Sequence, residues 1–465
     1  MVFADLAFLY VFLPLVFGLH AVVPSRWRNI VLVLASLCFY AWGEPIWVSL
    51  IIVSAFTDYH LGRAIAAESR KSRRTLYLAM SLCVNLGLLL TFKYSGFFIE
   101  TLNRLGLSLP VVRLSLPVGI SFYTFQTISY VVDVYRGRTQ AQESFFDYLL
   151  FVSLFFQLVA GPIVRYPQIA TEIRQRHLSL DAVAQGLFRF VIGLFKKVMV
   201  ANEAGRLASL FLDGPTASAT ILGAWTGAIL FSLQIYYDFS GYSDMAIGLG
   251  KMFGFSLPEN FHYPYTARSV KDFWRRWHMS LGSFFRDYLY IPLGGNRHLF
   301  IRNVMIVWFL TGLWHGASWN FVLWGLYFAC FLLLEKFLGV FFIHWPRVLS
   351  HIYLLLIVVV GWVLFYFTDI HRAFQHITIM FGFSGVSFSN FFVYITLANH
   401  VFWLTGAMMF CIPIFPVMLR LLQAPAGRFP RVIAVLATLF SLALLGFSTA
   451  HLVGRTYNPF LYYRF

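Results

Sequence analysis

The stretch His351-Ile-Tyr-Leu-Leu-Leu-Ile-Val-Val-Val-Gly-Trp-Val-Leu-Phe-Tyr-Phe367 is apolar at almost every position and contains no Lys, Arg, Asp or Glu. A helix needs about 20 mostly apolar residues to cross a hydrocarbon core of about 30 Å. A run of this composition and nearly this length therefore predicts a helix that crosses a membrane.

Comparable apolar segments recur along the chain. They are Leu6–Val23, Ile30–Tyr40, Leu76–Phe92, Phe145–Ile163, Ile221–Tyr236, Phe321–Phe342, Val401–Leu419 and Val432–Leu452. The 465 residues are 59% hydrophobic and 12% charged, which is too much apolar surface for a water-soluble protein. Because backbone polar groups in lipid must be satisfied within the protein, we expect an all-α polytopic membrane protein with about 10 to 12 embedded helices.

No polar stretch is long enough for a separate soluble domain, so residues 1–465 are expected to form one membrane domain. Two consecutive apolar segments cannot both be simple spans. Basic residues follow Leu114–Tyr135 and also Phe145–Ile163, which would place the C-terminal ends of both segments in the cytoplasm. Two consecutive helices that cross the membrane must end on opposite sides. We therefore expect a segment near Ser144–Arg165 that does not simply span.

The net charge of +16 comes from basic residues in short loops between apolar segments, as the positive-inside rule predicts. Nucleic acid is not needed to explain it, and membrane lipid is the expected environment. The cysteines Cys38, Cys83, Cys330 and Cys411 stand singly, so we expect neither a disulfide framework nor a bound metal.

Polar and ionisable residues gather in segment 236–325, which we interpret as the catalytic core segment. Its part Arg268–Arg302 holds seven basic residues against two acidic ones, among many aromatic residues. This pattern is typical of short amphipathic helices at the cytoplasmic face. Two interpretations stay open: a positive-inside loop, or a basic mouth in which Arg275 and Arg276 hold phosphate groups of a ligand.

Two histidines are the candidate catalytic residues. His315 lies in Gly312-Leu-Trp-His-Gly316, deep in an apolar segment, where an ionisable side chain suggests function. An imidazole can take a proton from a hydroxyl or thiol and so act as a general base. The alternative is a structural histidine bonded to a neighbouring helix. His278 follows Arg275-Arg-Trp277 and is the second candidate.

Asp238 and Asp244 lie in a polar island at the end of the Ile221–Tyr236 segment. Carboxylates near membrane depth need partners, and the Arg268–Arg302 cluster is the expected source of them. We expect structural ion pairs rather than a catalytic acid or base.

Several blocks of the sequence resemble the membrane-bound O-acyltransferase (MBOAT) family, and within it the branch that O-acetylates alginate. The blocks are Leu116–Gln126, Asp133–Gly137, Asp238–Gly250, Glu259–Phe261, Phe273–Leu281, Arg286–Tyr290, Leu293–Arg297 and Gly312–Ala317. They occur in the family's order and spacing as far as about Tyr327.

The resemblance implies a helical shell around a transmembrane tunnel, with short interfacial and re-entrant helices. It places the family's catalytic histidine at His315 and its second histidine at His278. Such enzymes take an acyl group from a cytoplasmic donor, here expected to be acetyl-coenzyme A. They pass it across the bacterial inner membrane to a periplasmic acetyltransferase or related protein that modifies an exported polysaccharide, expected to be alginate.

Other functions remain as alternatives. Related membrane proteins serve cellulose or peptidoglycan O-acetylation, or transfer D-alanine toward teichoic acids. A metabolite transporter would belong to a different class, and it should show paired interrupted helices in two related halves. No such symmetry is visible in the sequence. A structural scaffold would not need a histidine at membrane depth.

Overall fold

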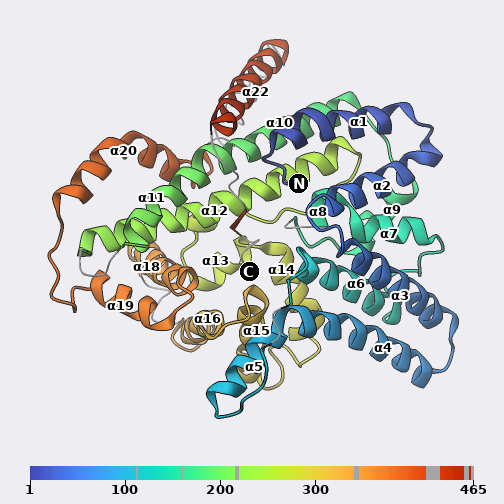
Figure 1. Cartoon of the computed structure of the whole chain (residues 1–465), viewed down its shortest axis with the longest axis horizontal. Helices are drawn as coiled ribbons and strands as arrows, with labels where there is room; N and C mark the ends of the chain where they lie inside the picture. The colour runs from blue at the N-terminus through green and yellow to red at the C-terminus, as the bar shows by residue number, and fades with distance from the viewer. Residues whose placement is uncertain are drawn as a thin grey trace. The chain divides into compact units, whose positions relative to one another are not determined.

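The computed structural model describes residues 1–111, 114–158, 161–214, 219–339, 345–414, 430–454 and 460–461. These residues form helices joined by turns and loops, and no strand occurs among them (Figure 1). The ends of two predicted spans, residues 340–342 and 415–419, lie outside the described residues.

The chain divides into two compact units. Unit 1 comprises Met1–Leu194, Tyr242–Glu259 and Leu452–Tyr463, and unit 2 comprises Phe195–Gly241, Asn260–His451 and Arg464–Phe465. The long helix α12 (Ile221–Met252) starts in unit 2 and continues into unit 1.

Unit 1 is built around one helix that is buried along nearly its whole length, α6 (Ile120–Tyr135), with α3 and α4 packed against it. Its helices are α1 (Leu13–Val22), α2 (Arg28–Ala41), α3 (Val48–Ala67), α4 (Lys71–Leu89), α5 (Ser95–Arg104), α6, α7 (Phe145–Ser153), α8 (Phe155–Leu158), α9 (Tyr166–Arg174) and most of α10 (Leu180–Phe195). As predicted near Ser144–Arg165, the apolar segment does not form one spanning helix. It forms the short helices α7 and α8, which are separated by Leu154, whose backbone (φ −44°, ψ 116°) is not helical.

A buried polar network ties α3, α4 and α6 together. The carboxylate of Asp58 accepts hydrogen bonds from Ser81 Oγ at 2.5 Å and Asn85 Nδ2 at 2.7 Å. Asn85 Oδ1 in turn accepts from Thr127 Oγ1 at 2.9 Å. Because a buried carboxylate is costly unless hydrogen-bonded, this network allows Asp58 to lie inside a helical bundle.

Unit 2 carries the predicted catalytic core segment for most of its length. Its helices are α11 (Asn202–Leu212), the first part of α12, α13 (Val270–Arg276), α14 (Met279–Phe285), α15 (Phe300–His315), α16 (Trp319–Phe337), α18 (Arg347–Tyr366), α19 (Ile370–Met380), α20 (Phe391–Met409) and most of α22 (Pro430–Val453). The helices α15, α16 and α18 pack in sequence, and α13 packs against both α16 and α18.

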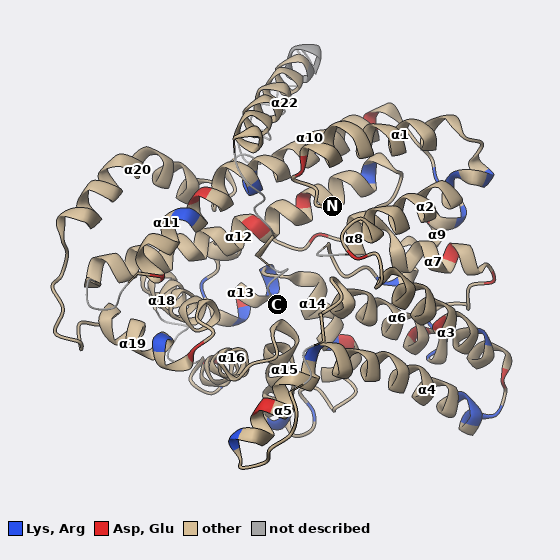
Figure 2. Cartoon of the chain, in the orientation of Figure 1, with Lys and Arg blue, Asp and Glu red and all other residues tan. Residues whose placement is uncertain are grey.

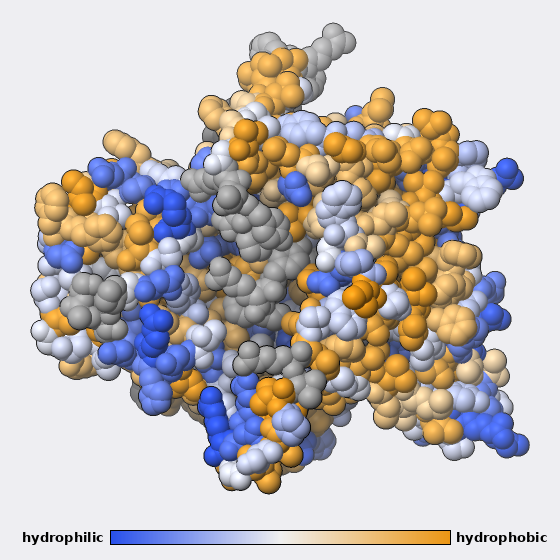
Figure 3. Space-filling view, in the orientation of Figure 1, coloured by the Kyte–Doolittle hydropathy of each residue, from blue (hydrophilic) through white to orange (hydrophobic). Residues whose placement is uncertain are grey.

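Among the described residues, five helical segments are long and apolar enough to cross a membrane: Lys71–Arg104, Trp319–Phe337, Arg347–Tyr366, Phe391–Met409 and Val435–Val453. Charged residues interrupt the helices only sparsely, and α20 has none (Figure 2). Hydrophobic side chains cover much of the outer face of α1 and α2 (Figure 3). Outward apolar side chains, such as Phe402 at 92% exposure, fit lipid rather than water. The protein is thus an all-α, multi-pass membrane protein.

One predicted span is displaced along the sequence. The segment Val401–Leu419 was expected to form it, but α20 begins at Phe391 and ends at Met409. Asn390 explains the earlier start, because its side chain accepts a hydrogen bond from Val393 N at 3.0 Å and so caps the helix.

Candidate active site

A tightly packed helix pair carries His315. The helix α15 ends at His315, and α16 begins at Trp319 after a short turn. A Cβ atom on Gly312 would lie 2.3 Å from the main-chain oxygen of Phe321, and one on Gly325 would lie 2.3 Å from that of Trp308. Only glycine permits this approach of two backbones, so these positions fix where α15 delivers His315.

Aromatic rings enclose the His315 imidazole. The residue is 3% exposed, and its ring centroid lies 4.9 Å from those of Trp314 and Trp324 and 5.5 Å from that of Phe365 on α18. Such surroundings exclude water, so charges that form there are poorly screened. His315 also occupies the last turn of α15, where the negative end of the helix dipole stabilises a protonated imidazole. The arrangement suits a side chain that takes up a proton during a reaction.

His278 contacts the same aromatic cluster. Its ring centroid lies 5.8 Å from that of Trp314 and 4.6 Å from that of Phe239, whose ring it meets edge-on. The residue is 2% exposed, and burial lowers the pKa of its imidazole to about 3, so it is neutral at neutral pH. The ring of Trp314 thus lies next to both predicted histidines, and the structure brings His278 and His315 together in one site.

The backbone of His278 adopts an unusual conformation. It has φ 45° and ψ 54°, in the left-handed region, at the junction between α13 and α14. For a residue other than glycine this conformation costs roughly 1–3 kcal/mol and persists only where the surroundings enforce it. Strain of this kind is concentrated at functional sites, which fits the prediction for His278.

The helix before this junction is anchored to α16. Glu335 of α16 accepts hydrogen bonds from the backbone N–H groups of Val270 at 2.6 Å and Lys271 at 3.1 Å, in the first turn of α13. Ser269 Oγ accepts a hydrogen bond from Asp272 N at 3.0 Å and so caps the same turn. These three bonds satisfy N–H groups that a helix end leaves without partners. They hold the first turn of α13, and the last turn of this helix leads into His278.

Arg275 and Arg276 occupy the last turn of α13, with different surroundings. Arg276 Nε lies 3.0 Å from Asp272 Oδ1, and its Nη1 donates to Thr266 Oγ1 at 3.3 Å. Arg275 is exposed. Arg276 is therefore already engaged within the protein, and Arg275 is the better placed of the two to meet an anionic ligand from solvent.

Other members of the basic region Arg268–Arg302 are also partly engaged. Arg286 Nε lies 2.7 Å from Asp287 Oδ1, and Arg302 Nη2 donates to Leu293 O at 3.1 Å. Part of the positive charge therefore stabilises the loop around η7 (Arg286–Tyr290).

The two aspartates of the polar island form ion pairs, as predicted, but with other partners than predicted. Asp238 Oδ1 lies 2.5 Å from Lys197 Nζ, and both residues are buried. In unit 1, Asp244 Oδ1 lies 2.9 Å from Arg189 Nη2, which also pairs with Glu259 at 2.6 Å. The expectation that the Arg268–Arg302 cluster supplies the partners is wrong, because earlier helical segments bring in Lys197 and Arg189.

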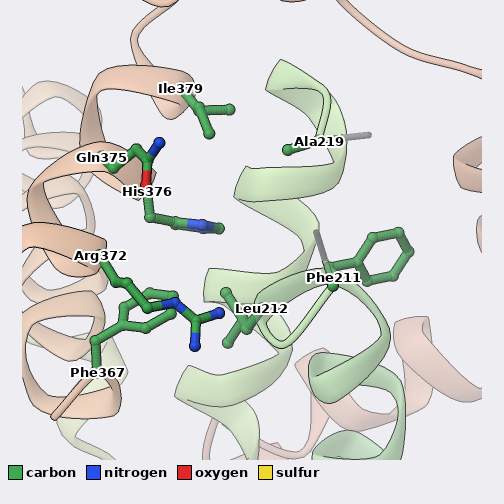
Figure 4. A pocket seen from close by; sticks show the side chains of 9 residues that line it. Phe211, Leu212, Ala219, Phe367, Arg372, Gln375, His376 and Ile379 are labelled. Atoms are coloured by element: carbon green, nitrogen blue, oxygen red, sulfur yellow. The ribbon is translucent and has the colours of Figure 1, made fainter. Parts of the chain in front are cut away.

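A separate pocket lies beside α19 in unit 2 (Figure 4). Its lining comprises Phe211, Leu212, Gly214, Ala219, Phe367, Arg372, Gln375, His376 and Ile379. The buried His376 places Nε2 3.3 Å from Ala224 O, which is a structural role. None of the predicted site residues lines this pocket. Within the described part of the chain, no group of three or more His, Cys, Asp or Glu side chains could hold a metal ion.

Sequence reasoning missed residues that shape the site. Trp314, Trp324 and Phe365 form the aromatic wall, and Asn260 contacts His278. The block Glu259–Phe261 contained a signal, since an asparagine between apolar helices needs hydrogen-bond partners.

Comparisons with known proteins show the family of the chain. The model of the membrane-bound O-acyltransferase family matches residues 140–374. A probable alginate O-acetylase AlgI of Azotobacter vinelandii is 40% identical over 84% of this chain and 80% of its own length, and one of Pseudomonas aeruginosa is 41% identical over 82% and 75%. A peptidoglycan O-acetyltransferase of Helicobacter pylori is 35% identical over 83% and 79%. The chain therefore belongs to the membrane-bound O-acyltransferase family and is an O-acetyltransferase.

Proposed function

We propose that this protein transfers an acetyl group from acetyl-coenzyme A, at the cytoplasmic face of the bacterial inner membrane, to a periplasmic partner that O-acetylates an exported polysaccharide. The observation that carries the proposal is the buried pair His315 and His278 in one aromatic cluster. The relatives named alginate O-acetylase favour alginate as the polymer.

In this proposal His315 is the general base. Its neutral imidazole takes the proton of the acceptor hydroxyl as that oxygen attacks the thioester carbonyl carbon. The carbon–sulfur bond breaks, the acetyl group passes to the acceptor oxygen, and the proton is returned to the leaving thiolate. The helix C-terminus stabilises the transient imidazolium, and the rings of Trp324 and Phe365 exclude water that would otherwise hydrolyse the thioester.

The other candidate residues have supporting roles. His278 positions the donor or assists proton movement, since it is neutral and contacts Trp314. Arg275, with Arg276 as a second cation, holds anionic groups of coenzyme A at the end of α13. In this proposal segment 236–325 is the catalytic core segment of the membrane domain formed by residues 1–465.

The test is the variant His315→Ala, with His376→Ala as the matched control. Both variants remove a buried histidine of unit 2. His315 packs against Trp314 and Trp324, whereas His376 bonds to Ala224 O. We expect H315A to abolish O-acetylation of the exported polymer while the protein inserts in the membrane at wild-type level, and H376A to retain activity. Wild-type acetylation by correctly inserted H315A would refute the proposal.

Peptidoglycan is the second candidate polymer, because the Helicobacter pylori relative is similar over most of both chains. Mass analysis of the acetyl content of both polymers, in a strain lacking this gene and in the complemented strain, distinguishes the two. Loss of acetyl groups from the exported polysaccharide alone supports alginate or another exopolysaccharide; loss from peptidoglycan alone supports the alternative.

A further inference from the structure

We infer that Asn260 is a positioning residue that holds His278 in a single tautomer, with the proton on Nδ1 and the lone pair on Nε2. This inference rests on the proposed participation of His278 in acyl transfer. It follows from the hydrogen bonds of one buried side-chain amide.

The orientation of the Asn260 amide is determined by a backbone group. Asn260 is fully buried, and its Oδ1 lies 3.2 Å from the main-chain nitrogen of Ser280 and 2.9 Å from Ser280 Oγ. A backbone N–H can only donate, so the atom that faces it must be the amide oxygen and not the NH₂ group. A flipped amide would set two donors against each other in a buried place.

The same oxygen determines the tautomer of His278. Asn260 Oδ1 lies 3.1 Å from His278 Nδ1. Because the amide oxygen carries no hydrogen, the hydrogen of this bond must come from Nδ1. In a neutral imidazole only one nitrogen is protonated, so Nε2 carries the lone pair. Burial keeps His278 neutral, as its pKa of about 3 indicates.

The backbone of Asn260 fixes the position of the ring as well. Its carbonyl oxygen accepts a hydrogen bond from Met279 N at 2.9 Å, and His262 N donates to Arg276 O at 2.9 Å. These two bonds flank His278 on both sides and hold the α13–α14 junction in its left-handed conformation. Side-chain and main-chain atoms of Asn260 therefore act on the same residue.

The tautomer has a chemical consequence. An Nε2 lone pair can accept a hydrogen bond or a proton from a hydroxyl or thiol, whereas the opposite tautomer would present an N–H group there. The bond to Asn260 stays compatible when Nε2 becomes protonated, since Nδ1 remains a donor. Asn260 thus permits repeated proton uptake and release at Nε2. Groups that orient a metal-bound histidine through such a bond typically contribute about 10–100-fold to its function, and we expect an effect of the same order for His278.

The experiment is a double-mutant cycle with Asn260→Ala and His278→Ala, each alone and combined. Acetyl transfer from radiolabelled acetyl-coenzyme A is measured in membranes that contain equal amounts of inserted protein. We expect N260A to lower the turnover rate about 10–100-fold, with little change in the Michaelis constant for the donor. If Asn260 acts through His278, N260A should cause no further loss in the H278A background.

The variant Asn260→Asp supplies a readout that a purely structural role would not change. Its carboxylate can still accept from Ser280 and His278, so activity should exceed that of N260A. Its negative charge favours the protonated imidazole, so the acidic limb of the rate profile should move to higher pH. Equal losses in N260A and N260D, with an unshifted profile, would overturn the inference.

Failure of the inference differs from failure of the proposed function. Full activity of H278A would remove the proposed role of His278. If H278A is impaired and N260A is fully active, only the role of Asn260 is refuted. The same holds if H278A is impaired and the losses of the two single variants add up in the double variant.

Discussion

Substitution of Gly312 by Ala tests whether the packing of α15 on α16 sets the position of the catalytic base. The new Cβ would lie 2.3 Å from Phe321 O, where ordinary contact begins near 3.4 Å, so the helices must separate by about 1 Å. The obstacle is backbone and cannot rotate away. Overpacking of this kind costs about 1–3 kcal/mol, and a misplacement of about 1 Å at a reacting group can lower the rate roughly 100-fold. We therefore expect G312A to lower acetyl transfer about 100-fold while the protein still inserts.

The matched control is Gly406→Ala in α20, where a Cβ would meet nothing within 4 Å. Because alanine favours a helix over glycine by about 1 kcal/mol, this variant should be as active as the wild type and at least as stable. Acetyl transfer is measured in membrane vesicles at equal protein content, and folding is checked by size-exclusion chromatography in detergent. Wild-type activity of G312A would show that the packing of α15 on α16 does not set the position of His315, and so would equal losses in G312A and G406A.

Two further predictions concern ion pairs, one buried and one part-exposed. Lys197→Met removes the cation that pairs with the buried Asp238 carboxylate, and it should lower the free energy of unfolding by about 3–5 kcal/mol. The thermal midpoint of K197M in detergent should therefore lie well below that of the double variant K197M/D238N. Equal midpoints would contradict the ion pair. Arg189→Lys removes the two-pronged bond to Glu259, in which Nη1 and Nη2 each lie 2.6 Å from a carboxylate oxygen. Because this site is part-exposed, the loss should be about 1 kcal/mol, and an unchanged midpoint would argue against it.

The spans that the sequence predicted best are those that face an apolar environment along their length. The helices α18 and α22 begin and end within a few residues of the predicted segments, because a charge-free apolar run leaves few alternatives. The helices α3 and α10 do not coincide with any of the clear apolar segments of the sequence. Asp58 in α3 and Arg189 in α10 lower the apolar character of their segments, and their partners are visible only in three dimensions.

For the candidate site, the sequence predicted the two histidines but not the residues that bond to them. His315 and His278 stood out because they interrupt apolar or aromatic sequence, and the structure brings both against Trp314. The sequence could not show that Asn260 bonds to His278, since that contact depends on the path of the chain between α12 and α13. The same holds for Lys197, which comes from a π-helical segment, η4 (Lys196–Ala201), before α11.

The helix α16 connects the positions of both histidines. Near its start, Trp324 packs on His315 and Gly325 admits the backbone of α15. Near its end, Glu335 holds the first turn of α13, whose last turn leads directly into His278. A shift of α16 therefore displaces both imidazoles at once, whereas a change at Asn260 acts on His278 alone. Variants at Gly325 and Glu335 should consequently resemble each other in their effect on turnover, although they lie at opposite ends of the helix.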